Sequence, residues 1–196
     1  MTMLSFNSDY NSVNIITIPN VLTKEECEII IDYANKQKKI IAKVGNNSLK
    51  KQIRSNNIVW LSSSKDKSLS WLFHKVAKTI VEVNNKIYNF HIIGLTEDFQ
   101  FTEYCKIDDH YNFHTDCGGT NVRKISASIQ LSDSKDYEGC NLEFAHLIDI
   151  PENQIEQNRN QGSMIIFPSY LTHKVTPLKS GKRYSLVIWV GGDNFK

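Results

Sequence analysis

The sequence predicts an α+β protein in which two N-terminal helices support a β core of the jelly-roll kind. Helical patterns are confined to the first half of the chain, and after His91 the pattern changes to short apolar runs separated by turn residues. Helices followed by strands favour the α+β class. Six or more short strands suit a closed or double-sheet core whose mouth can hold a small ligand. Because 196 residues suffice for one sizeable core, we expect a single domain over residues 1–196, with helical support at 1–95 and the β core at 96–192.

The first half is expected to hold two helices and two short strands. Residues 12–18 and 58–61 have the apolar, β-branched composition of strands. Thr23-Lys-Glu-Glu26 is a capping box, and apolar residues follow it at i, i+3, i+4 and i+7, which predicts an amphipathic helix. Residues 66–89 contain neither Gly nor Pro between their ends and carry apolar residues at helical spacing, so we expect a long second helix there.

The second half is expected to supply the strands of the core. Short β-forming runs alternate there with clusters of turn residues. The expected strands cover residues 99–105, 122–131, 141–147, 162–167, 173–178 and 183–191.

Composition and charge exclude several classes of function. Hydrophobic residues make up 40% of the chain and charged residues 22%, which is the range of soluble globular proteins. The net charge of +2 gives no electrostatic argument for nucleic acid or membrane, so neither is expected as a partner. The N-terminus lacks the basic region and apolar run of a signal peptide, and no apolar stretch is long enough to span a bilayer. We therefore expect a cytoplasmic protein, and the sequence does not give its oligomeric state.

Most residues of metal-ligand type are expected to have structural roles. The cysteines show no CxxC spacing, so they indicate neither a zinc ribbon nor a disulfide scaffold, and reduced thiols are expected. Four histidines are expected at the surface or in hydrogen bonds within the core. The cysteines are Cys27, Cys105, Cys117 and Cys140, and these histidines are His74, His91, His110 and His146.

Three residues of the second half form a candidate metal site. Residues two apart on an extended strand point to the same face, so His114 and Asp116 can place an imidazole and a carboxylate on one ion. His173 is the best third ligand because it follows an apolar run, 164–167, at a point where a strand would end. Two imidazoles and one carboxylate make the facial triad of non-haem Fe(II) oxygenases, which leaves coordination positions open.

Segments around these ligands resemble a known enzyme family. Tyr104 and Tyr111 lie ten and three residues before His114, and Arg183 lies ten residues after His173. With the segments named below, they resemble the 2-oxoglutarate- and Fe(II)-dependent dioxygenases of the prolyl 4-hydroxylase-like group. One departure is Cys140, where the family usually has a glycine. The resemblance extends from about Val21 to Gly192 and includes Ser126–Leu131, Tyr137–Gly139, Gly162–Pro168, His173–Pro177, Gly181–Arg183 and Tyr184–Trp189.

The resemblance implies a double-stranded β-helix with its helices packed on one outer face. It also implies that Fe(II), 2-oxoglutarate and O2 are used, with ascorbate as the reductant to consider. The products would be succinate, CO2 and a hydroxylated substrate side chain, with peptidyl proline as the first expectation. A free amino acid or another small molecule is the alternative substrate. A catalytically silent module that binds metal and 2-oxoglutarate is the alternative outside enzymes, and the intact ligand set counts against it.

Further residues receive expected roles. Arg183 has the planar fork that pairs bidentately with a carboxylate, and the family places its anchor for the distal carboxylate of 2-oxoglutarate at this spacing. Gly181 would permit the tight turn before it. The resemblance assigns Tyr104 a hydroxyl contact to the co-substrate and Gln130 a strand position facing it. Trp189 lies six residues after Arg183, on the same strand face, and is expected to wall the substrate site. Arg183 and the three metal ligands form the expected catalytic set.

Two more substrate contacts are expected, each with an alternative left open. Tyr111 is a candidate for the substrate wall or for core packing, since tyrosine commonly buries its ring and wets its hydroxyl. The basic stretch 36–51 is most simply a solvated charge run. Alternatively, residues 42–53 form a lid over the substrate with Arg54 at its base, because long polar loops beside a site often close over it.

Overall fold

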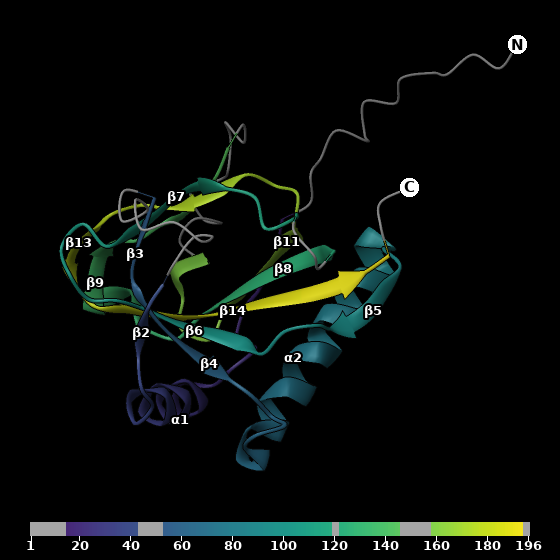
Figure 1. The fold of residues 1–196 in the computed structure, drawn as a ribbon, viewed down its shortest axis with the longest axis horizontal. Coiled ribbons are helices and arrows are strands. Elements are labelled where there is room, and N and C mark those ends of the chain that lie inside the picture. The colour runs from purple at the N-terminus through teal and green to yellow at the C-terminus, as the bar shows by residue number, and fades with distance from the viewer. Residues whose placement is uncertain (1–14, 43–52, 119–121, 146–157, 194–196) are drawn as a thin grey trace, which may run out of the picture.

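The centre of the fold is an antiparallel sheet of eight strands. The computed structural model describes residues 15–42, 53–118, 122–145 and 158–193. The strands of this sheet are β1 (Ile16–Ile18), β2 (Ile40–Ile41), β4 (Asn57–Leu61), β5 (Ile92–Leu95), β6 (Phe99–Tyr104), β8 (Arg123–Gln130), β11 (Met164–Pro168) and β14 (Arg183–Gly192). They run in the order β1-β11-β8-β14-β6-β4-β2, with β5 paired to β14 (Figure 1). The last strand of the chain thus lies in the middle of the sheet, between β8 and β6.

A smaller sheet faces the larger one. Its strands are β3 (Arg54–Ser55), β7 (His110–His114), β10 (Leu142–Phe144) and β12 (His173–Val175), in the order β10-β12-β7-β3. A third sheet pairs β9 (Tyr137–Gly139) with β13 (Leu178–Gly181), and a 3-10 turn, η5 (Ser134–Asp136), precedes β9. Side chains of the larger and the smaller sheet line one common cavity. This double-sheet arrangement confirms the predicted α+β class and jelly-roll core.

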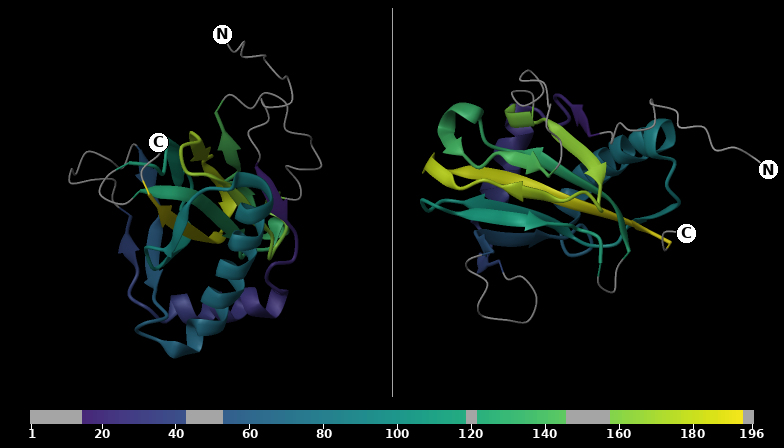
Figure 2. Two further views of the ribbon diagram at one scale, coloured as in Figure 1. Left: turned by 90° about the vertical axis from the view of Figure 1, so that its right-hand side faces the viewer. Right: turned by 90° about the horizontal axis from the view of Figure 1, so that it is seen from above.

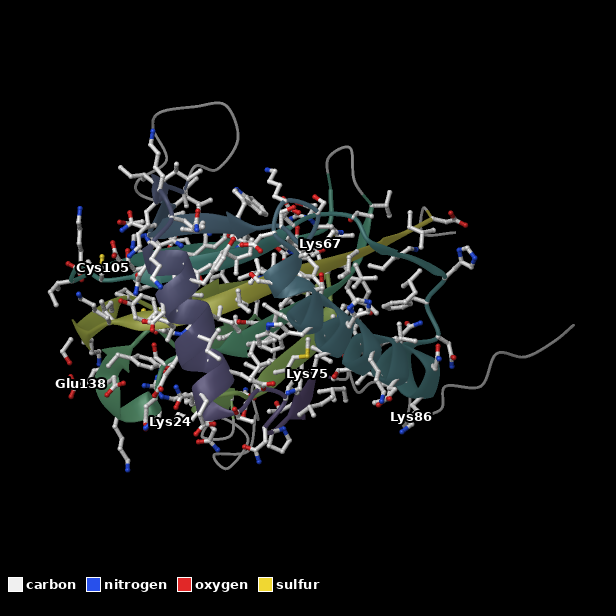
Figure 3. All side chains as sticks on the ribbon, turned by 90° about the horizontal axis from the view of Figure 1, so that it is seen from below. Lys24, Lys67, Lys75, Lys86, Cys105 and Glu138 are labelled. Carbon is white, nitrogen blue, oxygen red and sulfur yellow. The ribbon has the colours of Figure 1, made fainter. Side chains whose placement is uncertain are left out.

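Two helices cover the other face of the larger sheet. They are α1 (Lys24–Asn35) and α2 (Ser70–Val83), and both lie on the same side of the strands (Figure 2). Seen from below, they run across the sheet with Lys24 and Lys75 labelled on them (Figure 3). Lys75 forms an ion pair of 2.6 Å with Glu26, which joins the two helices. The predicted packing of the helices on one outer face is therefore confirmed.

The first helix begins as the sequence predicts. At the start of α1, the Thr23 hydroxyl accepts from the Glu26 backbone N–H, and the Glu26 carboxylate accepts from the Thr23 backbone N–H. The long second helix is a composite, in which a 3-10 turn, η3 (Lys67–Leu69), leads into α2 and a π-helical turn, η4 (Asn84–Tyr88), follows it. The described part of the chain contains no helix with the length and apolar content needed to cross a bilayer.

The period-2 alternation of the strands separates the core from the cavity. Along β14, Leu186 and Ile188 belong to the apolar cluster shared with the helices, whereas Ser185 and Val187 line the cavity. Strand β6 repeats the pattern, since Phe101 joins the core and its two neighbours Gln100 and Thr102 face the cavity. The larger sheet is thus a wall with an apolar core on one face and the site on the other.

Some predicted strands have different limits in the structure. The expected strand 173–178 is divided into β12 and β13, because Pro177 has no N–H to donate to a ladder. The strand expected at 12–18 corresponds to β1, and its residues 12–14 lie outside the described part of the chain. Strands β2, β3 and β5 have two to four residues each and are not predicted by any alternating pattern. All four cysteines are free, as expected.

Candidate metal centre

A cavity of about 350 Å³ lies between the larger and the smaller sheet. One wall comes from β6, β8 and β14, and the other comes from β3, β7 and β12. The cavity is lined by all three predicted metal ligands and by Arg183, Tyr104, Tyr111, Trp189 and Arg54. Sequence positions from 54 to 189 therefore meet in one place. Gln130 does not line this cavity, but it is buried beside it and its side-chain oxygen accepts from Arg183.

The three predicted ligands form a compact cluster. His114 ends β7 and His173 begins β12, and these two residues are direct partners across the antiparallel pair. The Nε2 atoms of His114 and His173 lie 3.7 Å and 3.6 Å from carboxylate oxygens of Asp116. One ligating atom from each residue lies within 4.8 Å of the other two. This is the spatial arrangement that a single ion requires.

Asp116 reaches the cluster by a different route from the one the sequence suggests. It lies two residues beyond the end of β7, so strand alternation does not set its direction. Instead, the backbone N–H of Asp116 donates to the Ser169 carbonyl oxygen over 3.0 Å. This contact joins the segment after β7 to the segment after β11 and brings the carboxylate to the histidines.

Hydrogen bonds fix how each ligand presents itself. The Nδ1 atom of His114 lies 2.8 Å from the Asn112 carbonyl oxygen, and Nδ1 of His173 lies 2.9 Å from the Leu171 carbonyl oxygen. Because a carbonyl oxygen only accepts, both Nδ1 atoms carry the proton and both Nε2 atoms keep a lone pair. The Ser126 hydroxyl donates to the second carboxylate oxygen of Asp116 over 2.7 Å. The cluster is therefore oriented for a metal by its surroundings.

The electrostatic environment keeps His114 neutral. Burial, followed by the neighbouring His173, lowers the pKa of His114 to about 4, although the Asn112 carbonyl and Asp116 act in the opposite direction. The neutral imidazole is the form that binds a metal ion. Two neutral imidazoles and one carboxylate fit Fe(II) by donor type, with coordination positions left for other ligands.

Comparison with known proteins identifies the family. The sequence model of the 2OG-Fe(II) oxygenase superfamily matches residues 99–191, a range that contains the whole metal cluster and Arg183. The chain belongs to this superfamily. It is an oxygenase that uses Fe(II) and 2-oxoglutarate, and His114, Asp116 and His173 are its facial triad.

Curated relatives of this oxygenase are PKHD-type hydroxylases. The chain is 28% identical over 181 residues to the one from Crocosphaera subtropica, and the match covers 90% of this chain and 78% of the relative. It is 27% identical over 187 residues to the one from Nitrosomonas europaea, with the same two coverages. Both relatives are thus similar over most of their length.

Solved structures confirm the fold of the oxygenase. The viral collagen prolyl hydroxylase of Paramecium Bursaria Chlorella virus-1 aligns with a TM-score of 0.68 and 19% identity, over 95% of this chain and all of that one. The prolyl hydroxylase of Trichoplax adhaerens, solved with a fragment of hypoxia inducible factor, aligns with a TM-score of 0.73 and 18% identity, over 93% and 85%.

Arg183 is the most deeply buried charged side chain of the oxygenase's cavity. It is 1% exposed, and its Nε donates to the Gln130 side-chain oxygen over 3.0 Å. It forms no ion pair with any described carboxylate. Across the ladder its partner is Tyr104, whose ring centroid lies 5.4 Å from the guanidinium carbon. Burial raises the pKa of Tyr104, and the cations Arg54 and Arg183 oppose that shift.

Aromatic side chains line the cavity beside the metal centre. The Tyr111 ring stacks on the His114 ring, with centroids 3.5 Å apart and planes at 14°. Trp189 lies 6.2 Å from Trp60 between ring centroids. The indole N–H of Trp189 is buried and has no hydrogen-bond partner among the described residues.

Two residues at this site are missed by the sequence reasoning. The guanidinium carbon of Arg123 lies 3.8 Å above the Trp189 ring, and its Nη1 lies 4.0 Å from Asp116. Glu97 holds this arginine with two contacts of 2.6 Å. Arg123 is the second residue of the expected strand 122–131, and nothing in its local pattern marks it as a cavity residue. The proposed lid falls largely on residues 43–52, which lie outside the described part of the chain, as does His146.

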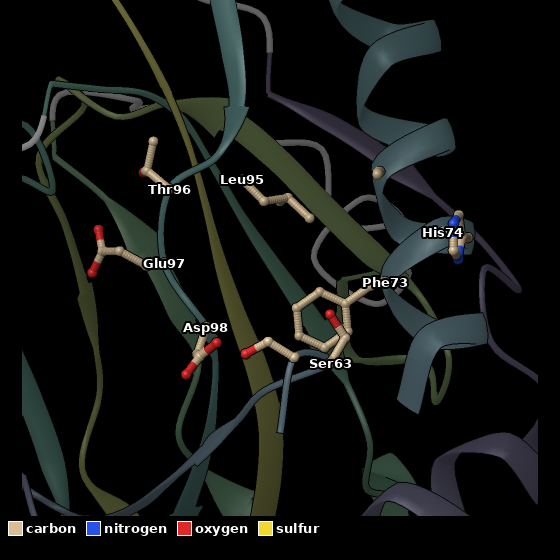
Figure 4. Close-up of a pocket in the computed structure, with 9 residues that line it drawn as sticks. Ser63, Phe73, His74, Leu95, Thr96, Glu97 and Asp98 are labelled. Carbon is tan, nitrogen blue, oxygen red and sulfur yellow. The ribbon is translucent and has the colours of Figure 1, made fainter. Parts of the chain in front are cut away.

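A second hollow of about 600 Å³ lies beside α2 (Figure 4). In the close-up, His74 lies on the helix, across the hollow from Glu97 and Asp98. These groups form no cluster of metal-ligating atoms within the described residues. Glu97 lines both hollows, so this side chain belongs to the wall between them.

Proposed function

We propose that this oxygenase hydroxylates a carbon atom of a substrate side chain, with peptidyl proline as the first candidate. The observation that carries the proposal is Arg183, a buried guanidinium held by a neutral amide in the same cavity as the metal triad. A second carboxylate-binding group beside the metal is what 2-oxoglutarate needs. The similarity to PKHD-type hydroxylases and to prolyl hydroxylase structures supports hydroxylation as the outcome.

The overall reaction balances when one oxygen atom of O2 enters succinate and the other enters the hydroxylated substrate. 2-Oxoglutarate, O2 and the substrate C–H give succinate, CO2 and the substrate C–OH. The chemistry supplied by bound Fe(II) is the activation of O2 that couples decarboxylation to hydroxylation. The chain's own task is to position both substrates and to exclude water from between them.

Arg183 and its neighbours would bind the co-substrate. Gln130 accepts from Nε, so the two terminal nitrogens of the guanidinium remain available for the distal carboxylate of 2-oxoglutarate. Gln130 would then be a positioning residue. The Tyr104 hydroxyl, in the same cavity, would donate to the co-substrate.

The substrate would lie against the aromatic side chains of the cavity. Tyr111 and Trp189 line the cavity from the smaller and the larger sheet, respectively. The unpartnered indole N–H of Trp189 can donate to a substrate carbonyl. These two residues, with Arg54, are the proposed substrate contacts.

The decisive test replaces Arg183. Arg183→Gln removes the charge and should lower 2-oxoglutarate affinity by roughly two to three orders of magnitude, because the bound carboxylate would be buried without a cationic partner. Arg183→Lys should recover part of the loss, since lysine restores the charge but not the fork. The measurements are succinate release against 2-oxoglutarate concentration and anaerobic titration of the Fe(II) protein.

Metal content provides the control for this test. Arg183→Gln should still bind one Fe(II) per chain, whereas His173→Ala should lose tight binding because two ligands hold the ion weakly. A variant Arg183→Gln that titrates with 2-oxoglutarate like the parent protein would show that Arg183 is not the anchor. A separate experiment identifies the substrate: peptides and amino acids are incubated with the active protein, and mass spectrometry detects the one that gains one oxygen.

A further inference from the structure

A second buried arginine in the cavity has no counter-ion among the described residues. Arg54 lies in β3, is 8% exposed and lines the same cavity as the metal triad. Its Nε donates to the Asn56 side-chain oxygen over 2.6 Å, and its Nη2 donates to the Gln100 side-chain oxygen over 2.7 Å. Both acceptors are neutral amides. Among the residues that the structure describes, no carboxylate lies within ion-pair distance of Arg54.

Two other cations near the site are paired with carboxylates. Arg123, in the same cavity, is paired bidentately with Glu97 at 2.6 Å. Lys39 is paired with the buried Glu103 at 2.6 Å. The cavity arginines without a carboxylate are therefore Arg183, which has a ligand to bind, and Arg54. A buried charge without a partner is costly, and such groups are typical of sites where a ligand supplies the missing charge.

The position of Arg54 places that missing anion close to the metal. Its guanidinium carbon lies 4.5 Å from the centroid of the Tyr111 ring, and the same ring stacks on His114. Arg54 and Tyr111 are also direct partners between β3 and β7. One aromatic ring thus separates the cation from a metal ligand. A group bound to Arg54 would lie beside the substrate carbon that reacts.

The segment directly before Arg54 has no acidic residue. Residues 43–52 contain three lysines and neither Asp nor Glu. The neighbouring amides, Asn56 and Gln100, are both buried, so they satisfy the hydrogen bonds of the guanidinium without neutralising it. The amides use Nε and one N–H of Nη2, so Nη1 and the other N–H of Nη2 can form a bidentate pair with a carboxylate.

We propose that Arg54 recognises a carboxylate on the substrate, close to the carbon that is hydroxylated. This inference rests on the proposed function and narrows it to acidic substrates. The carboxylate can be the α-carboxylate of a free amino acid, or it can be an Asp or Glu side chain beside the target residue. The chemistry at Arg54 is the same in each case.

The test neutralises Arg54 without removing it. Asn56→Asp has almost the same shape as the parent, and its carboxylate can still accept from Nε, so it supplies an internal counter-ion. We expect the preference for an acidic substrate over its amide to fall by roughly 10- to 100-fold, since the substrate loses a charge-assisted pair. Arg54→Gln should reduce the same preference by removing the charge itself.

A matched control exists outside the cavity. Arg159 also lacks a described carboxylate partner, and its Nη1 donates to the Asn141 side-chain oxygen. Neither residue lines the cavity. Asn141→Asp makes the same chemical change beside an arginine that has no proposed ligand. It should leave the ratio between acidic substrate and amide at the parent value.

The probes are matched pairs that differ only in one charge. They are free L-proline with L-prolinamide, and proline-containing pentapeptides with Glu or Gln on either side of the proline. One measurement is succinate release and oxygen gain with Fe(II), 2-oxoglutarate and O2. The other is the shift in melting temperature of the Mn(II)- and 2-oxoglutarate-loaded protein, which reports binding without turnover.

The outcomes separate this inference from the proposed function. A preference for the acidic members that is lost in Asn56→Asp and kept in Asn141→Asp supports the role of Arg54, and the pair that shows it identifies the source of the carboxylate. A parent protein that shows no preference for acidic members in either measurement overturns the inference. So does a preference that Asn56→Asp leaves unchanged. If the parent protein releases no succinate from 2-oxoglutarate, that result would instead contradict the proposed function.

Discussion

At the scale of single residues, the metal centre depends on a serine. Asp116 lies beyond the end of its strand, and the Ser126 hydroxyl holds one of its two carboxylate oxygens. Ser126→Ala should lower Fe(II) affinity by roughly 10- to 100-fold, because the carboxylate would lose the hydrogen bond that orients it. Ser163→Ala is the matched control, since that buried hydroxyl has no partner among the described residues. Competition with a metallochromic chelator measures both, and equal affinities would show that Ser126 does not orient the ligand.

Sequence reasoning predicts the chemical groups of the site better than their supports. His114, Asp116, His173 and Arg183 are found by residue type and spacing, and the structure brings them into one cavity. The supports depend on contacts between segments far apart in the chain. Glu97 and Arg123, for example, meet across 26 residues and two strands, and no local pattern encodes that pairing.

At the scale of elements, the turn before β14 places Arg183. Gly181 ends β13 with φ +75°, and a Cβ there would lie 1.9 Å from the Asp136 carbonyl oxygen. Gly181→Ala should therefore cost at least about 2 kcal/mol of unfolding free energy, from the left-handed backbone and the clash together. Gly94→Ala separates the two causes, because Gly94 also has positive φ but has open space around its Cβ position. If chemical denaturation shows equal losses for the two variants, the close contact at Gly181 is not the cause.

Helices and strands with long sequence patterns are predicted more accurately than those with short patterns. The capping box and the long apolar periodicity locate α1 and α2 well. The π-helical turn at 84–88 is not predicted, because its hydrogen bonds differ from those of an α-helix while its sequence pattern does not. Strands of two or three residues carry too few side chains to show a period. They form because a neighbouring strand has backbone N–H and C=O groups that can pair with them.

At the scale of the whole molecule, the larger sheet separates the apolar core from the metal site. Ile80 of α2 is 1% exposed in the core beneath the larger sheet, on the face opposite the cavity. Ile80→Ala should lower the unfolding free energy by about 2–4 kcal/mol through the cavity that it leaves. Below the unfolding transition, Fe(II) affinity should stay at the parent value. Val81→Ala, at an exposed position next in sequence, is the control for the loss of stability.

A fall in Fe(II) affinity in folded Ile80→Ala would show that the core and the metal site are coupled through the sheet.

The order of strands in the larger sheet is the part of the fold that the sequence alone predicts least. Strand β1, near the start of the chain, pairs with β11, and β14 at its end pairs with β8 and β6. Apolar alternation shows which face of a strand is buried, but it does not select the partner.

Both histidine ligands owe their orientation to the main chain two residues earlier, at Asn112 and Leu171. Every amino-acid type brings the same carbonyl oxygen to such a position, so a substitution there leaves the acceptor in place as long as the backbone keeps its path. The two imidazoles are thus protected against most changes in their immediate sequence neighbours. Over evolutionary time, such a centre can keep the geometry of its histidines while the residues between its ligands diverge. Asp116 is the most sensitive ligand to such substitutions, because its hydrogen bond comes from a side chain, that of Ser126.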